Sequence, residues 1–126
     1  MPSIINDQKT AAVQTTDATL TTIATIPITA SSTTVIEAIV TALQSTFANG
    51  RIWQFILGAR DNGGVSAILG TLQGLLNGLL GQGDVGSNAW TADLIISGTN
   101  VLIRVTGLVA TTINWRVDYK IRTHTP

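Results

Sequence analysis

The stretch TTINWRVDYKIRT, Thr111–Thr123, alternates apolar and polar side chains along its length. Successive side chains of a β-strand point to opposite faces of a sheet, so this alternation is typical of a strand with one buried and one hydrated face. The apolar set is Ile113, Trp115, Val117, Tyr119 and Ile121, and the polar set is Asn114, Arg116, Asp118, Lys120 and Arg122. The stretch therefore predicts a strand that covers a hydrophobic core.

Two segments just before this stretch show the same period. NVLIRVTG at residues 100–107 and AWTADLIIS at residues 89–97 both alternate, and SGTN at residues 97–100 supplies a turn between them. We expect these two segments and Thr111–Thr123 to form an antiparallel meander.

The middle of the chain predicts further strands. GRIWQFILGAR at residues 50–60 follows Asn49-Gly50, a type I′ hairpin signal, and precedes the turn sequence DNGG. TTVIEAIVTALQS at residues 33–45 is apolar on both sides. Its β-branched residues favour a strand, although its alanines and leucines also suit a helix.

The remaining segments complete an all-β pattern. TLTTIATIPIT at residues 19–29 predicts one strand or two short ones, at a sheet edge because of Pro27, and GVSAILGTLQ predicts another. Seven to eight strands at roughly 10–12-residue spacing are typical of an antiparallel β-sandwich or jelly roll. We expect a single β-sandwich domain over residues 14–126. Residues 1–13 lack a period and are expected to form an extended N-terminal arm.

Composition excludes several classes of protein. The 126 residues include seven basic and seven acidic residues, and only 11% are charged, against about 25% in a typical domain. No basic run points to nucleic acid, and there is no cysteine for a disulfide or a thiolate metal site. The start lacks a signal peptide, and the apolar stretch at residues 68–80 is too short to span a membrane. We expect a soluble protein that is made in the cytoplasm, and we expect part of its surface to be covered in its working state.

The segment LQGLLNGLLGQGD, Leu72–Asp84, is the candidate for that covered surface. It is apolar and glycine-rich, and it lies where a hydrated loop is expected. We predict self-association through its five leucines, with a cap over the chain's own sandwich as the alternative. These leucines are Leu72, Leu75, Leu76, Leu79 and Leu80.

No set of residues suggests catalysis or a cofactor. The single histidine, His124, lies near the chain end, and the common hydrolase, phosphate-binding and zinc motifs are absent. Asp61, Asp84 and Asp93 lack the spacing of a calcium loop, so we expect no metal. The three tryptophans fall on the apolar sides of their segments, where core packing is expected before sugar stacking; they are Trp53, Trp90 and Trp115.

Several phrases, in order, resemble a known family. They are TTDATLTTIATIPI at residues 15–28, a strand over residues 35–40, RDNGGV at 60–65, AWTADLIISGTNVLIRVTG at 89–107 and TTINWRVDY at 111–119. This order is similar to β-sandwich domains of tailed-bacteriophage virion proteins, which occur in tail fibres, spikes and small capsid- or tail-associated proteins. The apolar character of Leu72–Asp84 departs from the resemblance, where a polar loop is expected.

The resemblance implies a non-enzymatic virion structural protein, commonly a homotrimer. Because only a short arm precedes the domain, we expect a capsid decoration (cement) protein that clamps the major capsid protein or another virion protein. The arm is the candidate neighbour contact, through Ile4, Ile5 and Val13. The alternative is a receptor- or carbohydrate-binding module of a tail fibre or spike, with a binding loop around Arg60-Asp61-Asn62.

Overall fold

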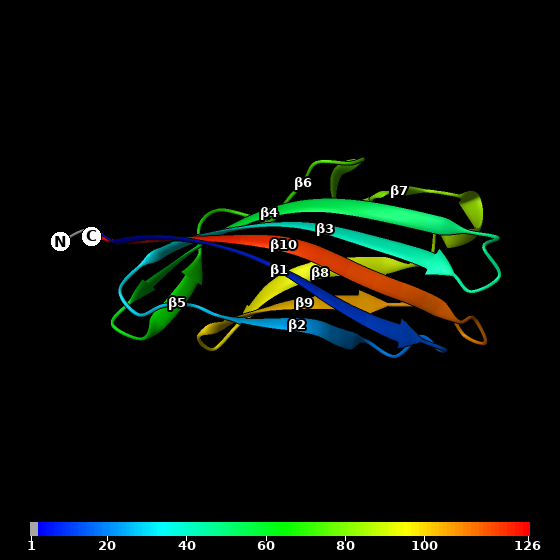
Figure 1. Cartoon of the computed structure of the whole chain (residues 1–126), viewed down its shortest axis with the longest axis horizontal. Helices are drawn as coiled ribbons and strands as arrows, with labels where there is room; N and C mark the ends of the chain where they lie inside the picture. Colours follow the sequence, from blue (N-terminus) through cyan, green and yellow to red (C-terminus); the bar gives the residue numbers. More distant parts are fainter. Residues whose placement is uncertain (1–2) are drawn as a thin grey trace.

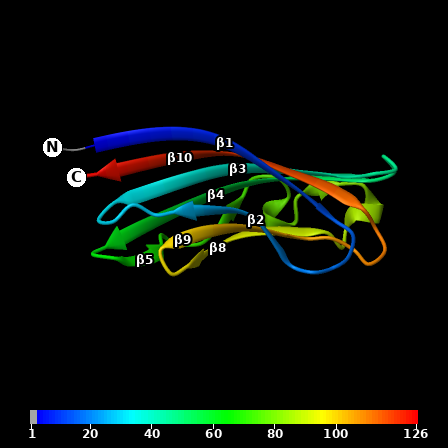
Figure 2. The ribbon, with the colours of Figure 1, turned by 60° about the horizontal axis from the view of Figure 1, so that its bottom comes forward.

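The computed structural model describes residues 3–126, with side chains from Asn6 onward, and shows two antiparallel β-sheets packed face to face (Figures 1 and 2). The strands are β1 (Ser3–Thr15), β2 (Thr21–Pro27), β3 (Thr33–Gln44), β4 (Gly50–Asn62), β5 (Val65–Ile68), β6 (Gln73–Gly74), β7 (Gln82–Gly83), β8 (Thr91–Ser97), β9 (Asn100–Thr106) and β10 (Ile113–Thr125). Two 3₁₀ turns, η1 (Gly78–Leu80) and η2 (Val85–Ser87), interrupt them. The predicted all-β fold is confirmed.

The two sheets differ in size. The large sheet has the order β1-β10-β3-β4-β5, and β6 and β7 also pair with β4. The small sheet has the order β2-β9-β8, which confirms the edge position that Pro27 predicts for β2. The segment left open between strand and helix is β3, a continuous strand in the middle of the large sheet. Its β-branched residues suit a pleated surface that is packed on both sides by neighbouring strands.

The predicted meander is half correct. β8 and β9 form the expected hairpin, but β10 lies in the other sheet, where it pairs with β1 and β3. Because β9 already pairs with β2 and β8 on its two edges, it has no free edge for β10. The chain instead crosses between the sheets after Thr106. Alternation in the sequence predicts each strand but does not identify its partner.

The connections at the two ends of β4 differ in turn type. The DNGG turn is tight, with positive φ at Gly63 (62°) and Gly64 (93°), as its glycines predict. The β3–β4 connection is instead a five-residue loop, and its positive φ lies at Phe47 (62°) rather than at Asn49-Gly50. The type I′ turn predicted there is wrong, because the amide of Gln44 donates to the carbonyl of Asn49 across the longer loop.

The predicted N-terminal arm is an edge strand of the sandwich. β1 pairs with β10 along its whole length, from Ser3 opposite Thr125 to Thr15 opposite Ile113, so the two chain ends lie side by side (Figure 1). Its weak periodicity reflects this edge position, because an edge strand is only partly covered. Lys9 and Asp7 share the inner side and form an ion pair at 3.4 Å. Inward-pointing charges of this kind discourage further strands from pairing at a sheet edge.

Aromatic residues join the two sheets at one end of the core. Trp53 of β4 and Trp115 of β10 stack with their ring centroids 5.5 Å apart, and Trp90, just before β8, lies 6.2 Å from Trp115. The Trp115 Nε1 donates to the Oγ1 of Thr15 at 2.8 Å. Aromatic pairs of this kind contribute about 0.5–1.5 kcal/mol beyond their burial. All three tryptophans are buried, as predicted, so none offers an exposed platform for a sugar.

Candidate functional site

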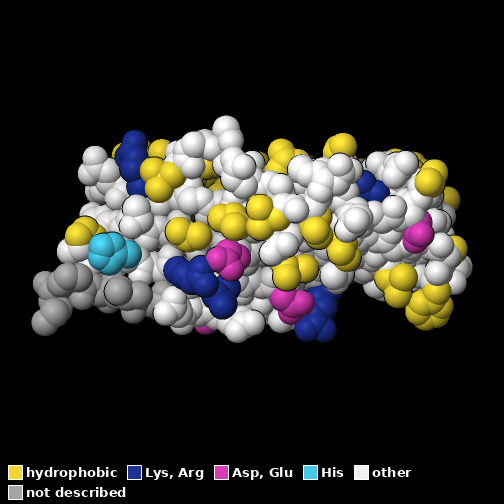
Figure 3. Space-filling model, turned by 90° about the horizontal axis from the view of Figure 1, so that it is seen from above, with side chains coloured by type: hydrophobic (Ala, Val, Ile, Leu, Met, Phe, Trp, Pro, Cys, Tyr) yellow, Lys and Arg dark blue, Asp and Glu magenta, His cyan; other side chains and the backbone are white. Residues whose placement is uncertain are grey.

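The outer face of the large sheet carries an unusual row of exposed apolar side chains. Alternate residues of β3 and β4 point away from the core, and Val35, Ile39 and Leu43 of β3 and Ile52 of β4 are exposed by 37–45%. Half-buried Ile56 lies among them. Figure 3 looks onto this face and shows the hydrophobic side chains gathered in a band along its length.

Two residues of the neighbouring edge segments extend this band. The amide of Leu69 donates to the Gly58 carbonyl, and the amide of Leu75 donates to the Gln54 carbonyl. Directly paired residues of an antiparallel ladder share a face, so both leucines lie on the outer side. We call the set the outer apolar stripe: Val35, Ile39, Leu43, Ile52, Ile56, Leu69 and Leu75.

Charged side chains border the outer apolar stripe on the β10 side. Arg122 pairs with Glu37 of β3, and Arg116 pairs with Asp118 at 3.1 Å. Thr10 of β1 donates a 2.7 Å hydrogen bond to Asp118. The Thr10 hydroxyl, followed by Arg116, holds the pKa of Asp118 below its ordinary value. Two ion pairs therefore lie along this border, and Lys120, on the same face of β10, adds a cationic group with no ion-pair partner among residues 6–126.

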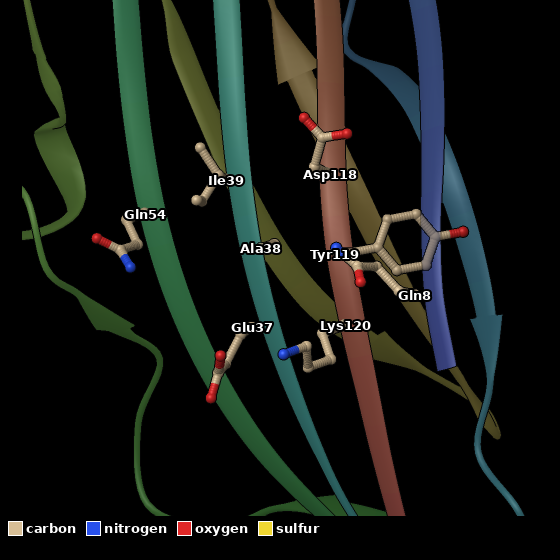
Figure 4. Close-up of a pocket in the computed structure, with 8 residues that line it drawn as sticks. All are labelled: Gln8, Glu37, Ala38, Ile39, Gln54, Asp118, Tyr119 and Lys120. Carbon is tan, nitrogen blue, oxygen red and sulfur yellow. The ribbon is translucent and has the colours of Figure 1, made fainter. Parts of the chain in front are cut away.

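A shallow depression of about 190 Å³ lies where the outer apolar stripe meets this border (Figure 4). Glu37 and Ile39 of β3 and Gln54 of β4 line it on one side, and Asp118 and Lys120 of β10 line it on the other. The side chains come from strands of one flat sheet, and the mouth is wide. No aromatic side chain among those drawn stands over its floor, because the ring of Tyr119 points toward β1 (Figure 4). The depression is an open hollow in the face of the sheet rather than an enclosed pocket.

The Leu72–Asp84 segment lies along the edge of β4. β6 pairs with Phe55 and Ile56, and β7 pairs with Arg51 and Ile52. Leu72 packs partly against the chain's own core and Leu76 is half-buried, whereas Leu75, Leu79 and Leu80 are exposed by 49%, 49% and 69%. The segment thus covers a sheet edge with its backbone and presents three leucines outward. Their predicted role in self-association stays a prediction.

Close packing explains Gly74 and Gly81 of this segment. A Cβ added at Gly74 would lie 2.0 Å from the carbonyl oxygen of Gly78. A Cβ at Gly81 would lie 2.5 Å from the carbonyl oxygen of Ile52 and 2.6 Å from the ring of Trp53. Gly81 also has φ 72° and ψ −169°, a region that only glycine adopts readily. The glycines therefore let the segment lie directly against β4.

Arg51 anchors the segment, and the sequence analysis gave it no role. Its guanidinium is buried, donates from Nε to the Leu80 carbonyl at 2.8 Å, and lies 5.8 Å from the centre of the Trp53 ring. Further hydrogen bonds reach the Gly81 carbonyl, the Ser87 hydroxyl and the Asn88 side chain. Its position in the sequence could have indicated this burial. Arg51 and Trp53 are two residues apart, so both point to the apolar side of the strand.

The three aspartates considered for calcium serve separate structural roles. Asp61 accepts hydrogen bonds from the amides of Ser31 and Gly64 and from the Ser66 hydroxyl, in that order of effect, and these lower its pKa. Asp84 accepts from the Gly50 amide, and Asp93 pairs with Arg104 at 2.7 Å. Within residues 3–126 no three metal-binding side chains are grouped together.

Of the remaining sequence candidates, His124 lies beside the outer apolar stripe, because it lines a shallow hollow together with Val35. Arg60 and Asn62 line a shallow hollow of about 380 Å³ near the chain end, but the carboxylate of Asp61 between them is already hydrogen-bonded within the loop. His124 is exposed on β10. Ile4 and Ile5 belong to β1, although their side chains lie outside the described part of the chain. Val13 packs against the chain's own core, and contact of this segment with a neighbour stays a prediction.

No helix in the described part of the chain is long and apolar enough to cross a membrane. No family model and no curated protein matches the sequence.

Two solved structures match this chain, to different degrees. One is the tailspike protein gp49 of Acinetobacter baumannii bacteriophage Fri1, a capsular polysaccharide depolymerase: the TM-score is 0.52, identity is 15%, and the match covers 94% of this chain and 17% of that one. The other is the tailspike protein of Acinetobacter baumannii phage AM24, with a TM-score of 0.44, 11% identity, and coverage of 99% of this chain and 26% of that one. This chain therefore spans a small part of either tailspike. The first match shows that its fold occurs as one portion of a larger phage protein.

Proposed function

We propose that the chain is a structural β-domain of a tailed-phage virion that is carried on or beside the tail spike, and that it performs no catalysis itself. The observation that supports this most strongly is the fold: 94% of the chain superposes on 17% of the Fri1 tailspike. The order of sequence phrases that resembles phage virion domains supports it independently.

The described side chains support a contact role better than an enzymatic one. Four aspartates are hydrogen-bonded or ion-paired within the chain, which leaves them poorly placed to act as general acids or bases. They are Asp61, Asp84, Asp93 and Asp118. The most distinctive surface is a flat apolar stripe, and exposed apolar patches commonly mark contacts between proteins. The Fri1 tailspike is a depolymerase, but this chain matches only a sixth or so of its length.

Two experiments test the proposal. Gold-labelled antibody against the purified chain is expected to mark the tail of particles of the phage that encodes it. Labelling of the head would instead favour the capsid decoration role expected from the sequence, and unlabelled particles would overturn both. Incubation of the chain with capsular polysaccharide of the host is expected to release no new reducing ends, and their release would overturn the non-enzymatic role.

A further inference from the structure

The two outer faces of the sandwich are unequal. Among the described residues, none of the large hydrophobic side chains exposed by more than a third lies in β2, β8 or β9 of the small sheet. The small sheet instead presents the Arg104–Asp93 pair at its surface. The large sheet presents the outer apolar stripe. The large sheet therefore presents the more apolar of the two faces.

The size of that face fits a stable protein contact. A strand of the length of β3 spans about 40 Å, and five strands about 4.8 Å apart give a face of roughly 800 Å². A standard protein interface buries about 800 Å² on each partner. The apolar part, over β3, β4 and the edge segments, is about half of that face, roughly 400–500 Å². A patch of this size is within the range of about 300–600 Å² that is typical of the largest patch on a monomer, and such patches are often functional.

The edges of the large sheet are less suited to a partner than its face. β5, β6 and β7 cover the edge of β4, and the inward-pointing Lys9 and Asp7 protect the edge of β1. A partner would consequently pack on the face of the large sheet. Two sheets packed in this way in a β-sandwich lie about 10 Å apart.

The charges of the face favour another copy of the chain over a strongly charged partner. Its border pairs Arg122 with Glu37 and Arg116 with Asp118, so it lacks the strong single-sign field that attracts nucleic acid or an acidic polymer. Because acidic and basic groups lie side by side on this face, two copies related by a two-fold axis can place opposite charges against each other around the apolar stripe. Closed homo-oligomers are built by such contacts.

We propose that the outer apolar stripe is the seam between copies of this chain, with Ile39 and Ile52 at its centre. This deepens the proposed function, since it names the surface through which a virion domain would assemble. It also revises the role of the leucine segment: Leu75 belongs to the seam, whereas Leu72 stabilises the chain's own core.

Light scattering behind a sizing column tests the seam on the purified chain. Wild type is expected to have two or three times the 13.2 kDa of one chain. Ile39→Lys/Ile52→Lys is expected to reduce that mass to a single chain, because it places charges in the seam. Leu20→Lys/Val109→Lys adds the same charge at loop residues exposed by 53% and 70%, and is expected to leave the mass unchanged.

Each other outcome has a defined meaning. A monomeric wild type at tens of micromolar, or an Ile39→Lys/Ile52→Lys variant that keeps the wild-type mass, would overturn the seam, as would equal dissociation of the loop control. If the lysine variant fails to fold by circular dichroism, Ile39→Thr/Ile52→Thr keeps the β-branched shape and is expected to weaken association at least tenfold; unchanged association would overturn the seam. The mass is measured on the purified chain without phage particles. A result that overturns the seam therefore leaves the labelling test of the virion role unaffected, and a result that overturns the virion role leaves the mass measurement unaffected.

Discussion

Replacing Gly81 by alanine is expected to destabilise the fold far more than the same change at Gly78, which lies three residues away in the same segment. Both glycines have positive φ, 72° at Gly81 and 62° at Gly78. An added Cβ meets nothing within 4 Å at Gly78, whereas at Gly81 it meets the Ile52 carbonyl oxygen at 2.5 Å and the Trp53 ring at 2.6 Å. The pair therefore separates backbone strain from close packing.

The magnitudes follow from these two contributions. An alanine in the left-handed region costs about 1–2 kcal/mol, which is the expected loss at Gly78. At Gly81 the glycine-only backbone region costs up to about 3 kcal/mol, and overpacking against a carbonyl that belongs to a sheet ladder adds about 1–3 kcal/mol. We expect a total loss of about 3–5 kcal/mol at Gly81.

Urea unfolding followed by tryptophan fluorescence measures both variants, since all three tryptophans are buried. With a slope of about 2 kcal/mol per molar urea, Gly81→Ala is expected to lower the midpoint by about 2 M and Gly78→Ala by less than 1 M. Protein concentration is held constant, because association shifts apparent stability. If the two variants unfold within about 0.5 kcal/mol of each other, the segment does not pack against β4 as described and the reasoning is refuted.

Three further predictions concern the anchor, the tryptophan cluster and pH. Arg51→Met is expected to cost about 2–4 kcal/mol and to speed hydrogen exchange at residues 80–88, because it leaves the Leu80 and Gly81 carbonyls without their donor; unchanged exchange would contradict the anchor role. Trp115→Phe is expected to cost more than Thr15→Val, since only the former loses the stacking as well as the 2.8 Å hydrogen bond, and urea midpoints that rank them in reverse would contradict this. The lowered pKa values of Asp61 and Asp118 mean that their stabilisation is fully present above the unfolded carboxyl pKa of about 3.9 and is lost as pH falls through the folded values. The urea concentration at the unfolding midpoint is therefore expected to decrease when the pH is lowered below about 4. In Asp61→Asn this decrease is expected to be smaller; an equal decrease in the variant would show that Asp61 does not contribute.

Local pattern predicted most of the strands because burial on one side leaves a direct trace in the sequence. The period of Thr111–Thr123 predicts β10, and the β-branched run before Gln44 predicts β3. β1 was not predicted as a strand, because an edge strand that is only partly covered needs no apolar alternation. The placement of β10 in the large sheet could not be predicted either, since alternation carries no information about which strand pairs with which.

The outer apolar stripe was predictable only in part. Residues 33–45 are apolar on both sides and the low charge content indicates that some surface is covered, which is the physical basis of the proposed seam. The sequence favours the leucines of Leu72–Asp84 as that surface, because a glycine-rich segment resembles a free loop. The register with β4, which brings Leu75 beside Gln54 and Leu69 beside Gly58, depends on long-range pairing. Arg51 was overlooked because a lone arginine is ordinarily hydrated.

The central claim is that this chain is a structural component of a phage tail, and quantitative mass spectrometry of purified particles tests it most directly. The account predicts that the chain is present in particles at far fewer copies than the major capsid protein, because a tail holds few copies of a spike-associated domain. A copy number comparable to that of the major capsid protein would indicate that the chain lies on the capsid surface and would contradict the tail role. Absence of the chain from washed particles would contradict the virion role altogether.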